Sequence, residues 1–272
     1  MMIDGKELKL SVRRMDLLRP HEETSDELVK SLRTRMTEEW VQRDPIVIDE
    51  KNSIILDGMH RFAALESLGT RHAVCFEQNY RDEKIRVFRW LRYLRKPKVV
   101  TLKKLSKSLG LNRTTSAEEA MEIVDSGESP MALIAQDKGF VSSRSKKTDG
   151  YNLVKIFDKI SHRSEEEVEI LEEDVAIDLV MTSGALLLTH KITKEDVVRA
   201  GESGRLLPYK TTLHVLPIRV LGIDFPISDL ADKRGAEAAL AKITSSPKLR
   251  FLDPPANYEG RVYGERVAVL EK

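Results

Sequence analysis

The segment that runs from Leu56 to Glu66, with the sequence LDGMHRFAALE, constrains the fold more than any other part of the chain. An apolar run ends at its start, Gly58 provides a tight turn, and a helical pattern of apolar residues begins directly afterwards. Gly69 stands where the end of a helix favours a residue that is free to take a positive φ. The pattern therefore predicts a strand, a glycine turn and a helix in direct succession. The apolar face of this helix comprises Phe62, Leu65 and Leu68.

The start of the predicted helix is suited to bind an anion. The first N–H groups of a helix have no partner within it and lie at the positive end of its dipole, so they bind phosphate readily. His60 and Arg61 add side-chain donors at the same place, and Met59 can offer its backbone N–H. The preceding Asp57 repels an anion unless something lies between them. Two arrangements resolve this conflict: Asp57 caps the helix, or it holds a divalent cation that bridges to phosphate oxygens.

The composition is that of a soluble globular protein, and its charge gives no reason to expect nucleic-acid binding. The 272 residues suffice for two domains, or for one domain with a large elaboration. With 45 basic and 44 acidic residues, the net charge is only +1. No apolar stretch approaches the ~18 residues of a membrane span, and no signal-peptide pattern is present. We therefore expect a cytoplasmic protein that is neither exported nor embedded in a membrane.

The only cysteine, Cys75, lies in the apolar run of residues 73–76. An intramolecular disulfide is therefore excluded, which suits a reducing cytoplasm. Because a cysteine in an apolar run is usually buried, we expect Cys75 to be a structural thiol and not a nucleophile.

Apolar periodicity and turn signals predict an α/β (α+β) fold in three segments. Residues 1–95 form a compact α/β domain, residues 96–230 a second α/β domain and residues 231–272 a C-terminal extension. Residues 141–149, rich in Ser, Lys and Arg, are expected to form a loop. Helices are expected to begin near Ser25, Phe62, Ser116, Tyr151, Val175, Thr193 and Ala236, the sixth ending at Gly201. Strands are expected over residues 8–15, 45–49, 53–56, 73–77, 85–93, 131–136, 168–171 and 186–190.

Two further segments carry side chains that suit a functional site. Glu22 follows Pro20 and His21 at the end of the first strand, where it is either a catalytic acid or an ordinary solvated loop residue. The segment 210–214, KTTLH, combines donors that suit a carboxylate or a phosphate, although the pattern alone favours an ordinary edge strand with alternating exposure. These donors are Lys210, Thr211, Thr212 and His214. Trp90 is either a core residue or the wall of a pocket.

Residues 105–113 are typical of the middle of a helix-turn-helix, with Gly110 in the turn. A recognition helix should follow, but the helix that starts within residues 114–119 is acidic, and phosphates would repel it. The pattern therefore does not favour DNA binding. The acidic residues are Glu118, Glu119, Glu122 and Asp125.

The segment 56–69 closely resembles the Asp-Gly-His/Val-His-Arg motif of the ParB/sulfiredoxin-like nucleotide-binding fold. Within that superfamily, the free L-serine kinases of archaea and some bacteria share a Pro-His-Glu element, like residues 20–22, and a Trp, like Trp90. They also share a Pro-Lys-Thr-Thr-Arg-His-Val-Leu-Pro element, which is PYKTTLHVLP at residues 208–217. The three motifs occur in the same order, so the chain resembles the free L-serine kinases.

This resemblance implies an enzyme that phosphorylates the hydroxyl of free L-serine with ADP or ATP and Mg²⁺, and so produces O-phospho-L-serine for amino-acid biosynthesis, including that of cysteine. It implies a ParB/sulfiredoxin-like N-terminal nucleotide-binding domain and a second α/β domain that closes the cleft. It makes Glu22 the general base and places Asp57 near the metal and phosphates, with Gly58, Met59, His60 and Arg61 around the phosphoryl chain. The implied substrate-side residues are Trp90, Lys210, Thr211, Thr212 and His214.

The sequence departs from the family pattern at three positions. Met59 stands where the motif often has His, Leu213 stands where the closest pattern has Arg, and Tyr209 interrupts the spacing of that element. The donor, ADP or ATP, stays open, and we expect a monomer or a homodimer. The alternative function is that of a ParB-like nucleotide-binding regulator associated with DNA, which the neutral charge balance disfavours.

Overall fold

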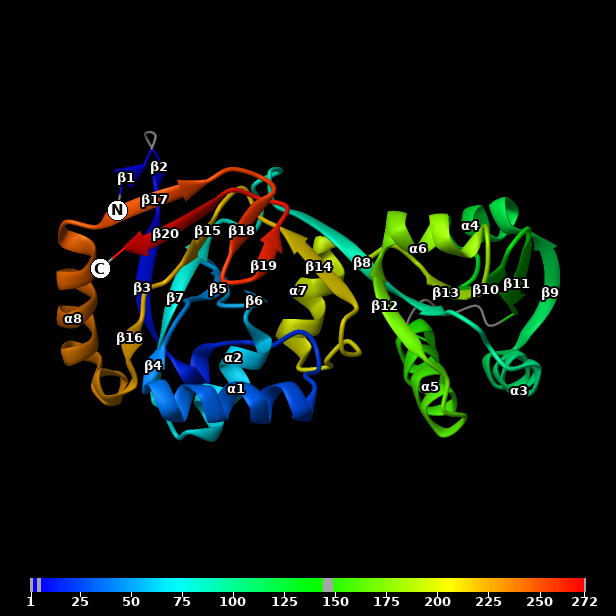
Figure 1. Ribbon diagram of the computed structural model, residues 1–272, viewed down its shortest axis with the longest axis horizontal. Helices are drawn as coiled ribbons and strands as arrows, with labels where there is room; N and C mark the ends of the chain where they lie inside the picture. The colour runs from blue at the N-terminus through cyan, green and yellow to red at the C-terminus, as the bar shows by residue number, and fades with distance from the viewer. Residues whose placement is uncertain (1, 4–5, 144–148, 272) are drawn as a thin grey trace. The chain divides into compact units, whose positions relative to one another are not determined.

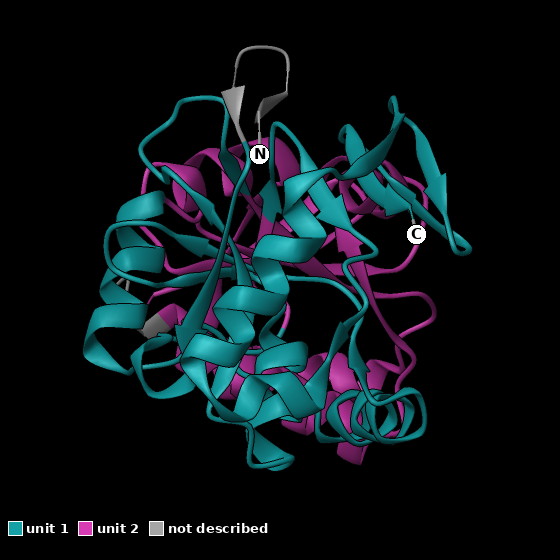
Figure 2. Ribbon diagram, turned by 90° about the vertical axis from the view of Figure 1, so that its left-hand side faces the viewer, with its two compact units in different colours: residues 1–87, 194–209, 214–272 teal, residues 88–193, 210–213 magenta. Residues whose placement is uncertain are grey.

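A computed structural model describes residues 2–3, 6–143 and 149–271, with its helices and strands labelled in Figure 1. The chain divides into two compact units (Figure 2). Unit 1 comprises residues 1–87, 194–209 and 214–272, and unit 2 comprises residues 88–193 and 210–213. These units differ from the predicted division at residues 95 and 230, because the chain returns to unit 1 after residue 193 and the C-terminal segment is part of that unit.

The central sheet of unit 1 has the strand order β3-β7-β5-β6. Strand β7 pairs antiparallel with β3 and parallel with β5, and β5 pairs antiparallel with β6. Ile46, Val47 and Ile48 in β5 are all buried, which accounts for their β-branched side chains in an inner strand. These strands confirm four of the predicted ones. Their bounds are Lys9–Arg14 for β3, Ile46–Asp49 for β5, Ile55–Asp57 for β6 and His72–Gln78 for β7.

Two helices of unit 1 begin where the sequence predicts. Helix α1 (Asp26–Glu39) is capped by Ser25, whose Oγ accepts a hydrogen bond from the N–H of Leu28 at 3.4 Å. Helix α2 (Met59–Ser67) follows Gly58, and Gly69 beyond its end has a φ of +73°. The predicted glycine at the end of α2 is therefore confirmed.

The C-terminal segment completes unit 1. Strand β20 (Val267–Glu271) lies between β15 (Arg219–Leu221), with which it is parallel, and β17 (Lys248–Leu252), with which it is antiparallel. Buried residues of these strands form one core cluster with those of a neighbouring hairpin. The segment therefore contributes to the core of unit 1. The other elements of unit 1 are β1 (Met2–Ile3), β2 (Lys6–Glu7), η1 (Met15–Leu17), β4 (Val41–Gln42), α7 (Lys194–Ser203), β16 (Phe225–Pro226), η2 (Ile227–Ala231), α8 (Lys233–Ser245), β18 (Ala256–Tyr258) and β19 (Arg261–Tyr263).

Unit 2 is built on a sheet with the strand order β12-β8-β13-β10-β11-β9, and β14 (Thr212–Val215) pairs with β8. Helices α4 (Ala117–Asp125) and α6 (Glu173–Val180) cover one face, and α3 (Val99–Leu109) and α5 (Asp149–Arg163) cover the other (Figure 1). Along β8, Leu91 and Tyr93 pack with the first pair of helices and Leu94 with the second, which follows from the alternation of side chains along a strand. The strands are β8 (Arg86–Leu94), β9 (Leu111–Ser116), β10 (Met131–Ala135), β11 (Lys138–Ser142), β12 (Val168–Glu172) and β13 (Ala185–Thr189).

The segment after α3 differs from a helix-turn-helix. Gly110 has a φ of +68° and ends α3, but residues 111–116 form strand β9, and only then does α4 begin. The acidic helix therefore starts at Ala117 and not within residues 114–116, and its predicted cap, Ser116, is confirmed by a hydrogen bond from the N–H of Glu119. No recognition helix follows the turn within these described residues.

Two other predictions need correction. Of the predicted loop at residues 141–149, the first two residues belong to β11 and the last begins α5, while residues 144–148 lie outside the described residues. Gly201 does not end α7, which continues to Ser203. A Cβ at Gly201 would lie 2.9 Å from the side chain of Ile54, so this glycine permits close packing, and Gly204 with a φ of +67° follows the helix end.

Two further expectations, on Cys75 and on membrane-spanning helices, can be compared with the structure. Cys75 is buried in β7, and burial raises the pKa of its thiol, as expected for a structural cysteine. Among the described residues, no helix combines the length and the apolar character that a membrane crossing requires.

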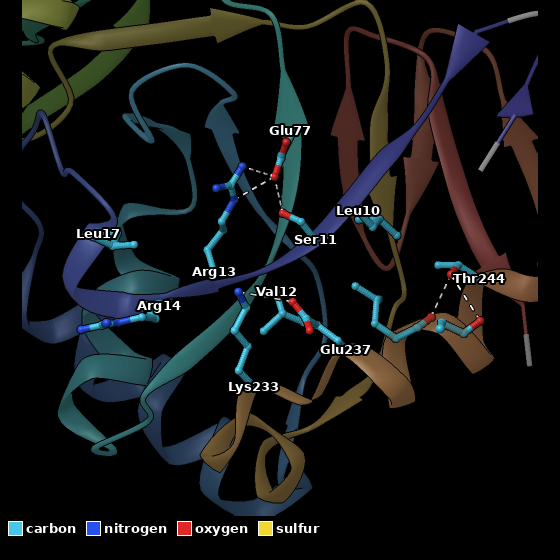
Figure 3. A pocket seen from close by; sticks show the side chains of 12 residues that line it. Leu10, Ser11, Val12, Arg13, Arg14, Leu17, Glu77, Lys233, Glu237 and Thr244 are labelled. Carbon is cyan, nitrogen blue, oxygen red and sulfur yellow. Dashed lines mark hydrogen bonds and ion pairs between the residues drawn. The ribbon is translucent and has the colours of Figure 1, made fainter. Parts of the chain in front are cut away.

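A groove of about 500 Å³ lies in unit 1 between β3 and α8 (Figure 3). Glu77 is buried at its side, where it accepts hydrogen bonds from Ser11 at 2.5 Å and from Arg13 Nε at 2.8 Å. Its other oxygen forms an ion pair with Lys9 at 2.6 Å. Burial raises the pKa of Glu77, but these donors outweigh it and lower the pKa. The candidate site residues are not among those that line this groove.

Candidate active site

The turn before α2 has a geometry that only glycine adopts easily. Gly58 has a φ of +97°, and a Cβ there would lie 2.5 Å from Arg61 Nη1. Arg61 Nη1 donates a hydrogen bond to the carbonyl of Pro45 at 2.7 Å, and Nη2 lies 3.9 Å from Asp44. The guanidinium therefore folds back over the turn, and it brings its positive charge to the start of α2.

Asp57 does not cap α2. Gly58 is the N-cap residue, and no side-chain hydrogen bond caps the helix. Instead, Oδ2 of Asp57 lies 2.9 Å from Nη1 of Arg219. Burial raises the pKa of Asp57, but the guanidiniums of Arg219 and Arg61 outweigh it and hold the pKa below its usual range. Asp57 is therefore a carboxylate with a partner that neither of the two sequence-based alternatives included.

Arg219 in β15 holds three groups together. Its side chain is only 8% exposed and pairs with both Asp57 and Glu265. Its Nη2 also donates a hydrogen bond to the carbonyl of His214 at 3.2 Å. Arg219 and Glu265 were not among the predicted site residues. A single arginine in the otherwise apolar stretch 216–223 was a usable signal, because a charge in such a stretch needs a partner.

His60 already has one partner. Its Nε2 accepts a hydrogen bond from the N–H of Ser25 at 3.1 Å, and its ring lies edge-on to Tyr209 with the centroids 5.6 Å apart. The hydrogen bond from Ser25, the N-cap residue of α1, connects the start of α1 to the first turn of α2.

Glu22 is not a solvated loop residue, because it is only 8% exposed. Its backbone forms a parallel bridge with Leu207. The N–H of Glu23 donates to the carbonyl of Leu207 at 2.9 Å, and the N–H of Leu207 donates to the carbonyl of His21 at 2.9 Å. The neighbouring His21 donates a hydrogen bond from Nδ1 to the carbonyl of Ile55, 2.7 Å away. These contacts fix the Glu22 segment against β6, the strand that ends at Asp57.

Two buried imidazoles and a phenol lie next to one another in unit 1. The rings of His21 and His214 are perpendicular, with centroids 5.5 Å apart, and Tyr80 Oη lies 2.8 Å from His214 Nε2. Burial lowers the pKa of His21 to about 4, although its hydrogen bond to Ile55 raises it. Burial and the neighbouring His21 also place the pKa of His214 well below its ordinary value. Both rings are therefore neutral at neutral pH. Tyr80 was not among the residues expected from the sequence.

The remaining candidate residues are brought together in unit 2. The ammonium of Lys210 lies over the ring of Trp90, 4.5 Å from its centroid. The N–H of Trp90 donates to the carbonyl of Thr211 at 3.2 Å, and Thr211 is buried. Trp90 and the segment 210–212 therefore form one cluster, whereas Glu22, Asp57–Arg61 and His214 belong to unit 1. The role of each residue toward a ligand stays a prediction.

The carboxylates near the turn limit how a metal ion can bind. Among the described residues, no three His, Cys, Asp or Glu side chains are grouped so that they could hold a metal ion. Asp57 and Glu265 both pair with Arg219, and Asp44 lies 3.9 Å from Arg61, so these carboxylates already have cationic partners. Mg²⁺ commonly takes one or two protein carboxylates and completes its shell with phosphate oxygens and water. The residues present fit such a site and do not fit one built by protein ligands alone.

Two relatives cover most of the chain. The ADP-dependent L-serine kinase of Thermococcus kodakarensis is 25% identical over 223 residues, which are 79% of this chain and 90% of the relative. The ATP-dependent L-serine kinase of Desulfurococcus mucosus is 26% identical over 225 residues, which are 75% and 84% of the two chains. No protein-family model matches the chain. A glutamate-to-alanine variant of a free serine kinase, solved in complex with ADP, has a TM-score of 0.71 at 23% identity and covers 83% of this chain and 95% of its own.

Over most of its length the chain is similar to L-serine kinases at about 25% identity. Its mixed α/β fold is that of the solved free serine kinase. This similarity supports a kinase at the level of the family, and the family resemblance found in the sequence is confirmed. The relatives differ in donor, since one is ADP-dependent and the other ATP-dependent. This similarity therefore leaves the donor of this chain open.

Proposed function

We propose that this protein is a free L-serine kinase that transfers a phosphoryl group from ADP or ATP to the serine hydroxyl and releases O-phospho-L-serine. The L-serine kinases among its relatives support this proposal. The observation that carries it is the position of Glu22 in unit 1. The hydrogen bond between His21 and the carbonyl of Ile55 fixes the Glu22 segment to the strand that leads into the Asp57–Arg61 turn.

The Asp57–Arg61 turn is the proposed site for the nucleotide phosphates. The first N–H groups of α2 and the helix dipole attract an anion, and Arg61 and His60 add donors. Asp57 alone would oppose an anion there, but its ion pair with Arg219 compensates its charge. A nucleotide can therefore approach the turn without facing an isolated carboxylate.

Glu22 is the proposed general base. A serine hydroxyl is a poor nucleophile at neutral pH, and a carboxylate that accepts its proton during attack contributes ~10²–10⁴-fold. In the proposed step the serine oxygen bonds to the terminal phosphorus of the nucleotide. The bond from that phosphorus to its bridging oxygen breaks, and the serine proton passes to Glu22. Burial of Glu22 limits access of water, which would otherwise compete as acceptor.

Asp57 is the proposed protein ligand of a Mg²⁺ ion, which when bound would offset the charge of the phosphate oxygens. On the amino-acid side we propose Trp90, Lys210, Thr211, Thr212 and His214. The Lys210 ammonium suits the carboxylate of serine, which matters here because Leu213 occupies the place of an arginine in the family pattern.

The decisive experiment is to incubate the protein with Mg²⁺, with ADP or ATP, and with each of the twenty amino acids, and to detect phosphorylated amino acids by mass spectrometry. We expect O-phospho-L-serine with at least one nucleotide, and we expect a Glu22→Gln variant to give far less. A different phosphorylated amino acid would overturn the substrate, and none at all with either nucleotide would overturn the kinase proposal.

A further inference from the structure

We propose that Arg92 is a positioning residue, which holds Lys210 in the backbone conformation that places its ammonium over Trp90. The inference concerns unit 2 alone. Its consequence for the amino-acid substrate rests on the proposed function, whereas the geometry it explains does not. Arg92 was not among the residues expected from the sequence.

Arg92 and Trp90 are two residues apart in β8, so their side chains leave the same face of the strand. The Arg92 side chain is only 3% exposed. Its Nε and Nη2 each lie 3.1 Å from one carboxylate oxygen of Asp158 in α5, which is a bidentate ion pair. Its Nη1 donates a hydrogen bond to the carbonyl of Lys210 at 2.9 Å. Arg92 therefore connects α5 to the backbone of Lys210.

Lys210 has a conformation that needs support. Its φ is +53°, in the left-handed region that side chains other than glycine disfavour. The peptide groups on its C-terminal side are held at two consecutive carbonyls: Arg92 binds that of Lys210, and the N–H of Trp90 binds that of Thr211 at 3.2 Å. A residue in such a conformation persists when its surroundings fix it, and these two hydrogen bonds do so.

With its backbone held in this way, Lys210 places its Nζ 4.5 Å from the centroid of the Trp90 ring. A cation over an indole face is stabilised by the ring quadrupole, and its position becomes defined. A charged group that is already in place binds a substrate carboxylate at a lower entropic cost than a mobile one. Arg92 would thus act on substrate affinity through Lys210, without touching the substrate.

An arginine is required at position 92 because its guanidinium donates three hydrogen bonds from three different nitrogens at once. The planar guanidinium pairs with both oxygens of Asp158 and still points a third N–H group at the Lys210 carbonyl. A lysine offers a single nitrogen and loses the fork. Asp158 is 42% exposed, so its replacement weakens the orientation of Arg92 without opening the core.

The test uses fluorescence, because the chain has only two tryptophans. In a Trp40→Phe background the emission comes from Trp90 alone. In that background, Lys210→Met removes the ammonium and so provides the reference emission of Trp90 without its cation. We expect Asp158→Ala and Arg92→Lys to move the emission toward that of Lys210→Met. Arg95→Lys is the matched control, because Arg95, directly after β8, also forms a bidentate pair, with Glu169, but is not part of the Lys210 contact. Arg95→Lys should keep the parent emission.

Kinetics on the same variants separate the inference from the proposed function. We expect the KM for serine to rise about tenfold in Asp158→Ala and in Arg92→Lys, with the nucleotide KM nearly unchanged. Unchanged Trp90 emission in both variants would overturn the inference even if the protein is an active serine kinase. A changed emission in a protein that phosphorylates no serine would support the positioning role and overturn the proposed function. Because the Asp158 side chain is 42% exposed, Asp158→Ala stays informative if Arg92→Lys fails to fold.

Discussion

Nη1 of Arg219 lies 2.9 Å from Oδ2 of Asp57, and this ion pair places a buried guanidinium directly behind the turn that opens α2. The carboxylate of Asp57 is thereby held ionised and oriented. Its negative charge is compensated by the protein itself, as the proposed binding of phosphates at this turn requires.

Replacement of Arg219 by Gln should destabilise the protein. The change leaves Glu265 and the partly exposed Asp57 without their shared cation, and we expect a loss of roughly 3 kcal/mol in the free energy of unfolding. Urea denaturation measures this loss. Nucleotide affinity, measured by calorimetry on the folded variant, should fall as well, because Asp57 then opposes the phosphates. Parent-like affinity would show that Asp57 does not face the nucleotide.

Replacement of Asp57 by Asn should preserve the fold, because Arg219 keeps its pair with Glu265. Most of the Mg²⁺-dependent activity should be lost. A readout independent of activity is the acid side of the stability curve. The pKa of Asp57 is lower in the native state than in the unfolded state, where it is ~3.9, so the ionised carboxylate stabilises the native protein above pH ~3.9. This contribution is lost as the pH falls through the native pKa of Asp57. The Asp57→Asn variant should lack that part of the pH dependence of stability. Full activity in the variant would show that Asp57 is not the Mg²⁺ ligand.

A pair of glycine substitutions separates backbone strain from the position of Arg61. Gly58 and Gly69 both have a positive φ, so Ala at either position should cost about 1 kcal/mol of stability. Only at Gly58 would the new Cβ meet Arg61 Nη1, while no atom lies within 4 Å at Gly69. We expect Gly58→Ala to weaken nucleotide binding about tenfold and Gly69→Ala to leave it unchanged. Equal affinities in calorimetric titrations would argue against Arg61 as a phosphate ligand.

The variant Glu22→Gln keeps the size and hydrogen bonding of the side chain but cannot accept the serine proton. The kcat should fall by ~10²-fold or more, about 3 kcal/mol of barrier, while the binding of both substrates changes little. The parent kcat should also fall at acid pH as this carboxylate is protonated, and the variant should not show this limb. Steady-state kinetics across pH, with a melting curve to verify folding, are the measurement. Near-normal turnover in the folded variant would remove Glu22 from the mechanism.

The buried imidazole of His21 should make stability depend on pH. Its native pKa of about 4 lies below the unfolded-state value of ~6.5, so the unfolded chain binds a proton that the native protein does not. Stability is therefore fully present above pH ~6.5 and decreases as the pH falls, by about 2 kcal/mol at pH 5 for this group alone. Urea denaturation between pH 7.5 and 5 should show the decrease. In His21→Gln the decrease in stability should be smaller. An equal decrease in the variant would show that other groups cause the pH dependence.

The features that the sequence predicted best are those set by neighbouring residues. The strand, glycine turn and helix around Gly58 depend on local periodicity and on a residue that can take a positive φ, and all three are present. Strand β9 was missed because its sequence, LNRTTS, is largely polar and its side chains are mostly exposed. An exposed edge strand lacks the apolar alternation that identifies a strand.

The partner of Asp57 depends on tertiary structure and was missed for that reason. Arg219 reaches it from β15, whose position follows from its parallel pairing with β20. No local pattern encodes a pairing between segments so distant in the chain. The division into units was missed for a related reason, since the composition does not change where the chain returns to unit 1.

The discontinuity of unit 1 has a consequence for the synthesis of the protein. A ribosome makes the Asp57–Arg61 turn first, then all of unit 2, and only afterwards Arg219 and the strands that hold it in place. A nascent chain that stops within unit 2 therefore carries Asp57 without its counter-charge and lacks the β15-β20-β17 sheet of unit 1. Contacts between distant segments form late, because the intervening chain must first be closed into a loop. Unit 2 can fold while it is being made, whereas unit 1 must wait for residues 214–271 before the surroundings of the Asp57–Arg61 turn are complete.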